Sequence, residues 1–200
     1  RAADFAFDTS GSYGLDMFVS APYNGGGGPG DPIYRVEPDG TVTTFFQDAG
    51  YDVMASGITF GQGGAYGDSL YAQNRTPYGG WYGLQRIEPD ASTTQFGADL
   101  TEASWQESLV ITGGGSFGVS AYVTDVGQRR ILTMEGDGHF VEFATGLISV
   151  SLAMGSGAFG ERLYTGFGPD QIWTYTSDGE GSMFASGFGD NILGMDIVDD

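Results

Sequence analysis

The sequence predicts an all-β fold, a β-propeller built from four-stranded antiparallel blades. The first observation is a blade-sized unit of roughly 40 to 50 residues that occurs four times along the 200-residue chain. The second is that each unit contains four short apolar segments separated by turns, which is the strand content of one blade. The third is the wide distribution of 36 glycines and 7 prolines, which suits a fold with many turns. We therefore expect one propeller domain over residues 1–200.

Each unit opens with a short apolar run and a glycine-rich turn. The runs are at residues 5–7, 57–60, 109–111 and 152–154. A run this short and apolar is typical of a strand buried on both faces, so it predicts the innermost strand of a blade. The Gly-x-x-Gly turn that follows ends at Gly14, Gly67, Gly118 and Gly160. A second strand is expected directly after the turn and contains residues 17–19, 70–72, 121–123 and 163–165.

The second half of each unit is a hairpin. Its first strand covers residues 33–36, 84–87, 131–134 and 172–175. The turn after that strand contains Asp39, Asp90, Asp137 and Asp178. The outermost strand follows at residues 42–46, 93–96, 140–143 and 182–184. Because Asp-Gly between strands is a strong hairpin signal, and the four Asp residues share one repeat position, we interpret them as turn residues and not as a carboxylate site.

These elements divide the chain into blade units at about 2–53, 54–106, 107–149 and 150–191, with residues 192–200 as the start of another. Residues 193–198 repeat the inner-strand run a fifth time. A closed ring of four blades needs one copy fewer of that strand, so we expect a longer native chain, with six blades as a candidate number. The chain starts at Arg1 without an initiator Met, so we also expect a removed N-terminal segment and an extracellular, periplasmic or cell-surface location.

The best-defined part of the repeat, at residues 33–40, reads Ile-Tyr-Arg-Val-Glu-Pro-Asp-Gly, and Leu163-Tyr164 stands in the second strand of the last unit. In these residues the chain resembles six-bladed propellers of the NHL, SMP-30/gluconolactonase and virginiamycin B lyase type. The resemblance covers nearly the whole chain and implies a propeller fold. It concerns the blade and not an active site, and the group includes lactonases, lyases and binding scaffolds. Function therefore has to be argued from the site.

Charge and composition exclude several functions. The chain has 26 Asp and Glu against 7 basic residues, all of them Arg, and a formal net charge of −19 at pH 7. Nucleic acids and anionic membranes are therefore not expected as partners. No apolar stretch reaches the roughly 18 residues that a transmembrane helix needs. With no Cys, no Lys and only His139, the sequence offers no Cys-His pair, no Schiff-base lysine and no multi-histidine zinc site. His139 is expected on the surface.

Two segments match the dinucleotide-binding pattern Gly-x-Gly-x-x-Gly, at residues 113–118 and 155–160. Both matches fall at the same place in the repeat, and neither opens a predicted helix. Strand-connecting turns explain them better, because glycine adopts the left-handed backbone of tight turns freely. We therefore expect no nucleotide cofactor.

A candidate binding face follows from the topology. The loops between second and third strands, and those that join one blade to the next, should emerge on one face, over the mouth of the central channel. The aromatic side chains of these loops are candidates for ligand binding: Tyr51, Trp81, Tyr82 and Trp105. The gluconolactonase-like propellers, which the chain resembles, hold a divalent cation at this place. Oxygen donors in the loops are candidate ligands for Ca²⁺: Asp52, Glu107, Asp190 and Asn191.

Two functions remain open from the sequence. The first is a non-enzymatic exported propeller, a binding or scaffold subunit that recognises a protein or a glycan, within a larger assembly or at the cell surface. The second is a Ca²⁺-dependent lactonase-like hydrolase or lyase, in which the cation polarises a carbonyl and a carboxylate acts as base. We expect the first function, because the sequence contains no recognisable acid-base pair.

Overall fold

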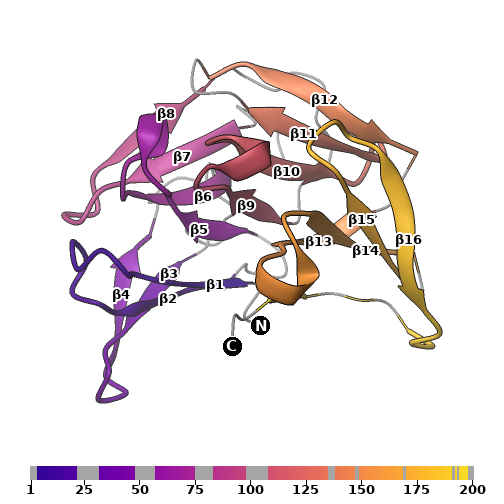
Figure 1. Cartoon of the computed structure of the whole chain (residues 1–200). Coiled ribbons are helices and arrows are strands. Elements are labelled where there is room, and N and C mark those ends of the chain that lie inside the picture. Colours follow the sequence, from indigo (N-terminus) through magenta and orange to yellow (C-terminus); the bar gives the residue numbers. More distant parts are fainter. Residues whose placement is uncertain are drawn as a thin grey trace. The chain divides into compact units, whose positions relative to one another are not determined.

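The computed structural model describes residues 4–21, 32–47, 57–74, 83–97, 108–134, 138–146, 149–168, 170–190, 192 and 194–197. These residues form four four-stranded antiparallel sheets, and in each sheet the strands pair in chain order (Figure 1). Each sheet is one propeller blade, so the all-β propeller fold predicted from the repeat is confirmed. The chain divides into two compact units, Arg1–Glu102 and Ala103–Asp200, each with two blades.

The strands match the predicted segments to within a few residues. Blade 1 contains β1 (Asp4–Phe7), β2 (Met17–Ser20), β3 (Ile33–Val36) and β4 (Val42–Phe46). Blade 2 contains β5 (Ile58–Phe60), β6 (Leu70–Asn74), β7 (Gly83–Ile87) and β8 (Thr93–Phe96). Blade 3 contains β9 (Leu109–Ile111), β10 (Ala121–Asp125), β11 (Arg130–Met134) and β12 (Phe140–Thr145). Blade 4 contains β13 (Ser149–Met154), β14 (Leu163–Phe167), β15 (Gln171–Tyr175) and β16 (Gly181–Ser186).

The fifth apolar run, predicted to start a further blade, is described only in part, so its role stays a prediction. Its described part, residues 194–197, forms no strand. Ile192, just before this run, lies close to blade 4, because the Ser151 hydroxyl donates a hydrogen bond to its carbonyl oxygen at 3.3 Å. An apolar run becomes a strand only when a neighbouring strand pairs with it, and the run at 194–197 has no such partner among the described residues.

The Gly-x-x-Gly turn joins the first and second strands of each blade. In blades 2, 3 and 4 it holds a single 3₁₀ turn: η1 (Gly64–Tyr66), η2 (Gly115–Phe117) and η3 (Gly157–Phe159). Both glycines of the turn have positive φ in every blade, from +52° at Gly157 to +93° at Gly14. Side chains rarely adopt this backbone, so the glycines serve the turn, and the dinucleotide pattern is a blade turn as predicted. No helix in the described part of the chain is long and apolar enough to span a membrane.

The residue directly after the inner strand closes this turn in one of two ways. In blade 1, the Asp8 carboxylate accepts hydrogen bonds from the backbone N–H groups of Tyr13 and Leu15, at 2.8 and 3.0 Å. In blade 3, the Thr112 hydroxyl donates to a carbonyl of the turn at 2.8 Å. Blades 2 and 4 have glycine here because the turn approaches closely: a Cβ on Gly155 would lie 2.7 Å from a turn carbonyl oxygen. The position directly after the inner strand therefore holds either a residue whose side chain hydrogen-bonds to the turn or a glycine.

An aromatic triad recurs in every blade. Its members come from the glycine turn, the second strand and the fourth strand: Tyr13/Phe18/Phe45, Tyr66/Tyr71/Phe96, Phe117/Tyr122/Phe143 and Phe159/Tyr164/Phe184. Ring centroids within a triad are 4.8 to 6.3 Å apart, in edge-on or tilted arrangements. Such pairs stabilise a core beyond their buried area. In blades 1, 3 and 4 the fourth-strand Phe lies at a β-bulge. A bulge changes the direction in which the side chain at that position points.

Within each unit, the triad of one blade packs against the next blade. In the first unit, the rings of Tyr13 and Phe18 lie 5.1 and 5.6 Å from that of Phe60 in β5. Apolar side chains of β6 and β7 belong to the same buried cluster. In the second unit, Phe143 lies 6.1 Å from Tyr175 of blade 4, in an equivalent cluster. A main part of each unit's core therefore lies between its two blades.

Hydrogen bonds near the inner strands also link the blades of each unit. The residue at or just before the start of the inner strand accepts a hydrogen bond from a backbone N–H of the inner strand of the next blade. In the first unit, the Asp4 carboxylate accepts from Ile58 at 3.0 Å. In the second unit, the Ser108 hydroxyl oxygen accepts from Leu152 at 3.0 Å. Because one repeat position makes the same contact twice, the two blade pairs are built alike.

Candidate functional site

Most of the residues predicted for the channel mouth lie outside the described residues. These are Tyr51, Asp52, Trp81, Tyr82, Trp105, Glu107 and Asn191, whose roles stay predictions. Asp190 is described, and it is exposed in a bend after β16. The described part of the chain contains no group of three or more His, Cys, Asp or Glu side chains that could hold a metal ion. A Ca²⁺ site at the mouth stays a prediction from the sequence.

Asp125, at the end of the second strand of blade 3, has a structural role. It ends β10 and is fully buried. Its carboxylate accepts a hydrogen bond from Nε of Arg130 at 3.0 Å and a second from the backbone N–H of Gln128 at 3.3 Å. Buried charges of this kind are costly unless they are paired. Asp125 therefore holds the turn from β10 to β11.

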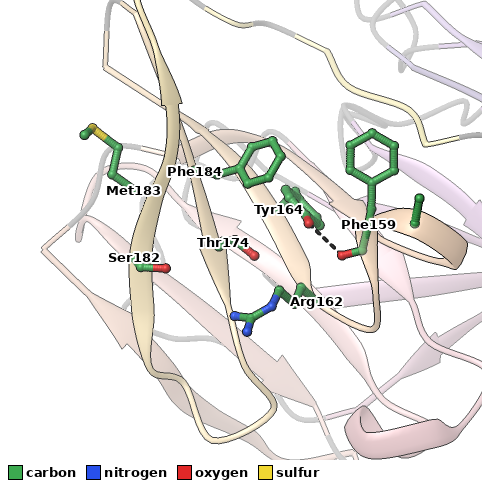
Figure 2. A pocket seen from close by; sticks show the side chains of 8 residues that line it. Phe159, Arg162, Tyr164, Thr174, Ser182, Met183 and Phe184 are labelled. Carbon is green, nitrogen blue, oxygen red and sulfur yellow. Dashed lines mark hydrogen bonds between the residues drawn. The ribbon is translucent and has the colours of Figure 1, made fainter.

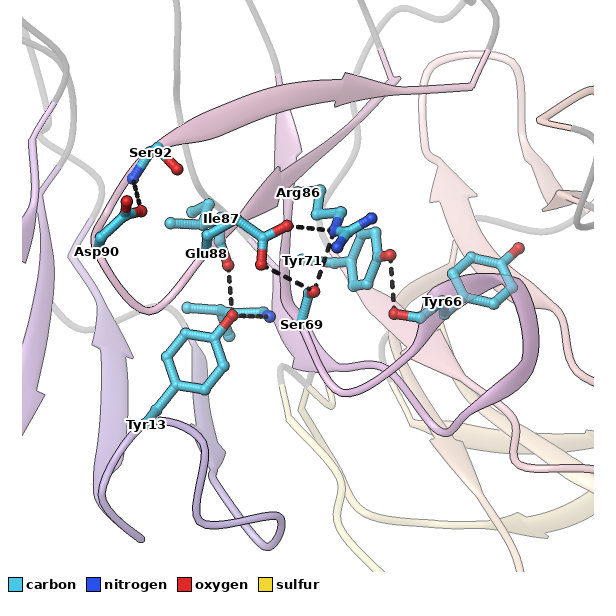
Figure 3. Close-up of polar contacts among 10 residues, drawn as sticks. Tyr13, Tyr66, Ser69, Tyr71, Arg86, Ile87, Glu88, Asp90 and Ser92 are labelled. Carbon is cyan, nitrogen blue, oxygen red and sulfur yellow. Dashed lines mark hydrogen bonds and ion pairs between the residues drawn. The ribbon is translucent and has the colours of Figure 1, made fainter.

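A second ion pair joins the second and third strands of blade 1. The buried Asp16 carboxylate pairs there with the guanidinium of Arg35. In blade 2 the same two positions hold Ser69 and Arg86, and Nε of Arg86 donates to the Ser69 hydroxyl at 3.0 Å (Figure 3). Arg86 also pairs with Glu88 at 2.6 Å. These charged groups hold the strands of a blade together.

Tyr13 connects blade 1 to blade 2 through its hydroxyl. The hydroxyl accepts a hydrogen bond from the Leu70 N–H at 3.1 Å and donates one to the Ile87 carbonyl oxygen at 2.6 Å (Figure 3). Leu70 and Ile87 are opposite each other in the β6–β7 ladder. Burial raises the pKa of the Tyr13 phenol, which therefore stays protonated at neutral pH. A neutral hydroxyl can donate and accept at once, as this position requires.

Other buried tyrosines are packing residues. Burial raises the pKa of Tyr71 and Tyr122, and it raises the pKa of Tyr175 to about 12. A phenol that stays protonated at neutral pH is a poor general base. His139 is exposed at the start of β12, as expected from the sequence.

A shallow pocket of about 440 Å³ lies on blade 4, on the face that carries its aromatic triad (Figure 2). Phe159, Tyr164 and Phe184 line it together with Arg162 and Met183. The Tyr164 hydroxyl donates to the backbone carbonyl of Phe159 at 2.8 Å, which fixes this ring. Phe159, Met183 and Phe184 are each about half exposed. An exposed cluster of large apolar side chains indicates an interaction surface.

A second pocket, of about 450 Å³, lies between β12 of blade 3 and the outer strands of blade 4. Phe143, Trp173 and Tyr175 line it, and Glu142 supplies the one carboxylate among its lining residues. General acid–base catalysis needs a group matched to a reacting atom and usually a partner for it. We therefore interpret this pocket as a gap between outer strands.

The blade 4 face is a feature that the sequence analysis does not identify as a site. A signal for it is present, because every copy of the glycine turn carries an aromatic residue at the same position: Tyr13, Tyr66, Phe117 and Phe159. The sequence shows that the position is aromatic in all copies. It does not show that Phe159 is exposed while the other three are buried.

Comparison with known proteins identifies the fold. No family model matches the chain, and no curated protein matches it in sequence. Among solved structures, the chain is similar to a streptogramin B lyase, with 18% identity, a TM-score of 0.58, and coverage of 85% of this chain and 51% of that chain. It is similar to virginiamycin B lyase from Staphylococcus aureus, with 16% identity, a TM-score of 0.52, and coverage of 85% and 52%.

A third similar structure is a catalytically inactive virginiamycin B lyase from the same organism with quinupristin. It has 14% identity and a TM-score of 0.56, with coverage of 92% of this chain and 69% of that chain. The chain spans about half the length of the first two lyases. These similarities show the fold alone: a β-propeller similar to that of virginiamycin B lyase, as the blade repeat predicted.

Proposed function

We propose that this chain is a non-enzymatic binding or scaffold subunit that recognises a protein or glycan partner through the loops at the channel mouth of its propeller. The protein acts at an extracellular, periplasmic or cell-surface location. Its partner is neither a nucleic acid nor an anionic membrane, because a formal net charge of −19 repels both.

The observation that carries the proposal is the use of carboxylates within the blades. Asp8 holds a glycine turn through backbone hydrogen bonds. Asp16 and Asp125 are buried in ion pairs with arginines of the adjacent strand. Asp4 joins one inner strand to the next. Acidic groups that hold strands and turns make a rigid frame, and rigid frames that present loops are common among binding proteins.

The composition of the mouth loops supports recognition by contact. Two of the three tryptophans, Trp81 and Trp105, belong to the predicted face, together with Tyr51 and Tyr82. Tyr and Trp give a large contact area at low conformational cost and carry a polar group at one end. They suit both protein and sugar surfaces.

A tryptophan fluorescence titration tests the proposal. The third tryptophan, Trp173, lies in β15, and the substitution Trp173→Phe leaves Trp81 and Trp105 as the only reporters. This variant is screened on a glycan array and against a displayed peptide library, and each binder is then titrated in solution. We expect a saturable change in fluorescence. Trp81→Ala or Trp105→Ala should weaken binding at least tenfold, about 1.4 kcal/mol, while Trp173→Phe alone should bind like the unsubstituted chain.

Two results would overturn the proposal. One is binding that neither Trp81→Ala nor Trp105→Ala affects, which would remove the mouth from recognition. The other is turnover of a simple lactone or of quinupristin, the compound in one similar lyase structure. Turnover that requires added CaCl₂ and is lost in Asp52→Asn or Glu107→Gln would support the hydrolase or lyase alternative.

A further inference from the structure

We propose that the gap between the outer strands of blades 3 and 4 binds a neutral sugar residue. The gap has a volume of about 450 Å³ and lies between β12 and the hairpin of β15 and β16. Both of its walls come from consecutive blades of the second unit. None of its described lining residues belongs to the loops predicted for the channel mouth, so this site does not rest on the proposed function.

Blade 4 departs from the repeat where it lines the gap. Tyr175 and Gly181 lie opposite each other where β15 ends and β16 begins. The other three blades have a side chain at both of these positions: Val36/Val42, Ile87/Thr93 and Met134/Phe140. A glycine in a strand often marks a place where a ligand or another segment approaches closely. The Tyr–Gly pair is therefore specific to blade 4, and the other blades form without it.

Two glycines shape the blade 4 wall of the gap. A Cβ on Gly181 would lie 2.5 Å from Cε1 of the Tyr175 ring, so the glycine lets this ring lie against the outer strand. Gly179, in the hairpin turn, has a φ of +78°, and a Cβ there would lie 2.5 Å from the carbonyl oxygen of Phe143 in blade 3. The glycines therefore fix both the position of the Tyr175 ring and the approach of the hairpin to β12.

The Tyr175 hydroxyl is the polar side-chain group that this wall offers to a ligand. Tyr175 is 3% exposed and lines the gap, yet its hydroxyl makes no hydrogen bond with any described residue. Burial raises the pKa of this phenol to about 12, so it is neutral at physiological pH and can both donate and accept. A buried polar group without a partner is costly, and a sugar hydroxyl, which also donates and accepts, would satisfy it.

Trp173 adds a fixed aromatic ring to the same wall. Trp173 and Tyr175 are two residues apart in β15 and therefore lie on the same face of the strand. The indole Nε1 donates to the side-chain oxygen of Gln171 at 3.0 Å, and the Phe167 ring packs edge-on at 6.0 Å. The indole is only partly buried and lines the gap. Ligand pockets commonly combine such aromatic walls with a few polar groups that fix orientation, and a sugar has an apolar C–H face for the ring and hydroxyls for the phenol.

The side chains that face the gap favour a ligand without charge. Glu142 is the one charged residue among the described residues that line it. Glu142 is opposite Leu132 in the β11–β12 ladder, and the neighbouring Ile131 belongs to the buried cluster between blades 3 and 4. Because successive residues of a strand alternate between its faces, Leu132 and Glu142 point away from blade 4. The carboxylate therefore does not face the ligand, and a neutral sugar fits better than a charged one.

Titration with neutral glycosides tests this site. The double variant Trp81→Phe/Trp105→Phe keeps Trp173 as the only tryptophan, so its fluorescence reports on the gap, and a failure of the mouth proposal leaves the result unchanged. Methyl glycosides of glucose, galactose, mannose and N-acetylglucosamine are added, and saturation-transfer NMR detects binding that leaves the fluorescence unchanged. We expect saturable binding of at least one of them. Glucosamine and glucuronate, which carry a charge, should bind more weakly.

Two further substitutions locate the binding. Tyr175→Phe removes only the hydroxyl and should weaken binding about three- to tenfold, as expected for one hydrogen bond. Trp173→Ala, measured by saturation-transfer NMR, should weaken it at least tenfold. Tyr122→Phe is the matched control and should not change binding, because Tyr122 is buried in the same cluster but does not line the gap. The proposal would be overturned if the folded chain bound no neutral glycoside, if Tyr175→Phe bound equally well, or if the charged sugars bound more tightly.

Discussion

At the scale of single residues, Tyr13 shows how one position of the repeat gains a second role. Its ring belongs to the aromatic triad, and its hydroxyl bridges two backbone groups of the next blade. Phe117 and Phe159 occupy the same repeat position without a hydroxyl. Such a bridge is therefore ruled out in blades 3 and 4, whose Phe residues keep only the packing role.

Removing this hydroxyl should cost stability. Tyr13→Phe leaves the Leu70 N–H and the Ile87 carbonyl without their buried partner, and an unsatisfied buried group costs about 1 to 3 kcal/mol. Urea unfolding at neutral pH measures the loss. The control is Tyr175→Phe, because Tyr175 is also buried but its hydroxyl has no hydrogen-bond partner among the described residues. Equal losses in the two variants would show that the bridge contributes nothing.

Asp8 should make stability depend on acid. Burial raises the pKa of its carboxyl, but hydrogen bonds from Ser10, Leu15 and Tyr13 outweigh burial, and the pKa lies below its usual value of 3.8. A group with a lowered folded-state pKa stabilises the fold above its unfolded-state pKa, and this contribution is lost as the pH falls through the folded-state pKa.

We therefore expect Asp8→Asn to be less stable at pH 7, by on the order of 2 kcal/mol, and to lose less stability than the unsubstituted chain below about pH 4. Thermal unfolding between pH 3 and pH 7 measures both effects. Asp178→Asn, at an exposed hairpin turn, should follow the curve of the unsubstituted chain. If the curve for Asp8→Asn runs parallel to that of the unsubstituted chain, the acid dependence does not come from Asp8.

The turn residues could be predicted from the sequence, and the bridge could not. The carboxylates of Asp39 and Asp90 accept hydrogen bonds from N–H groups two residues further on, at 2.8 and 2.9 Å, as expected of Asp in a turn. These contacts are local, so a short pattern contains them. The partners of the Tyr13 hydroxyl are 57 and 74 residues away in the chain, and only the packing of blades brings them together.

At the scale of elements, the strands follow from alternation and turn signals, which are local. The predicted bounds of β3, β4, β8 and β9 agree with the structure. The β-bulges of the outer strands were beyond prediction, because they depend on where the aromatic side chain must point. Residues 194–197 belong to an apolar run but form no strand. An apolar pattern does not make a strand without a neighbouring strand to pair with.

One repeat position offers a test of packing between blades. Phe60→Ala removes a ring that contacts the triad of blade 1, and we expect it to cost about 3 to 5 kcal/mol. Phe7→Ala changes the same repeat position in an exposed strand and should cost less than about 1 kcal/mol. Both are measured by urea unfolding at neutral pH. Similar losses would contradict the role of Phe60 in joining the blades.

At the scale of the whole molecule, the blades carry the structure and the loops carry the proposed recognition. The repeat was sufficient to predict the propeller, because each blade satisfies the same local rules. It was not sufficient for the site. Asp125, at the end of β10, is a loop-proximal carboxylate that pairs with Arg130 within the blade, which the repeat alone does not show. Loop residues such as Trp81 and Trp105 obey no repeat, so their roles have to be measured.

The central claim is that, in each unit, the aromatic triad of the first blade packs against the second blade. Nuclear Overhauser contacts between labelled Phe and Tyr rings test this claim most directly. The structure predicts contacts between Tyr13 and Phe60, whose centroids are 5.1 Å apart, and between Phe143 and Tyr175, at 6.1 Å. A well-dispersed spectrum of the folded chain that lacks both contacts would contradict the account.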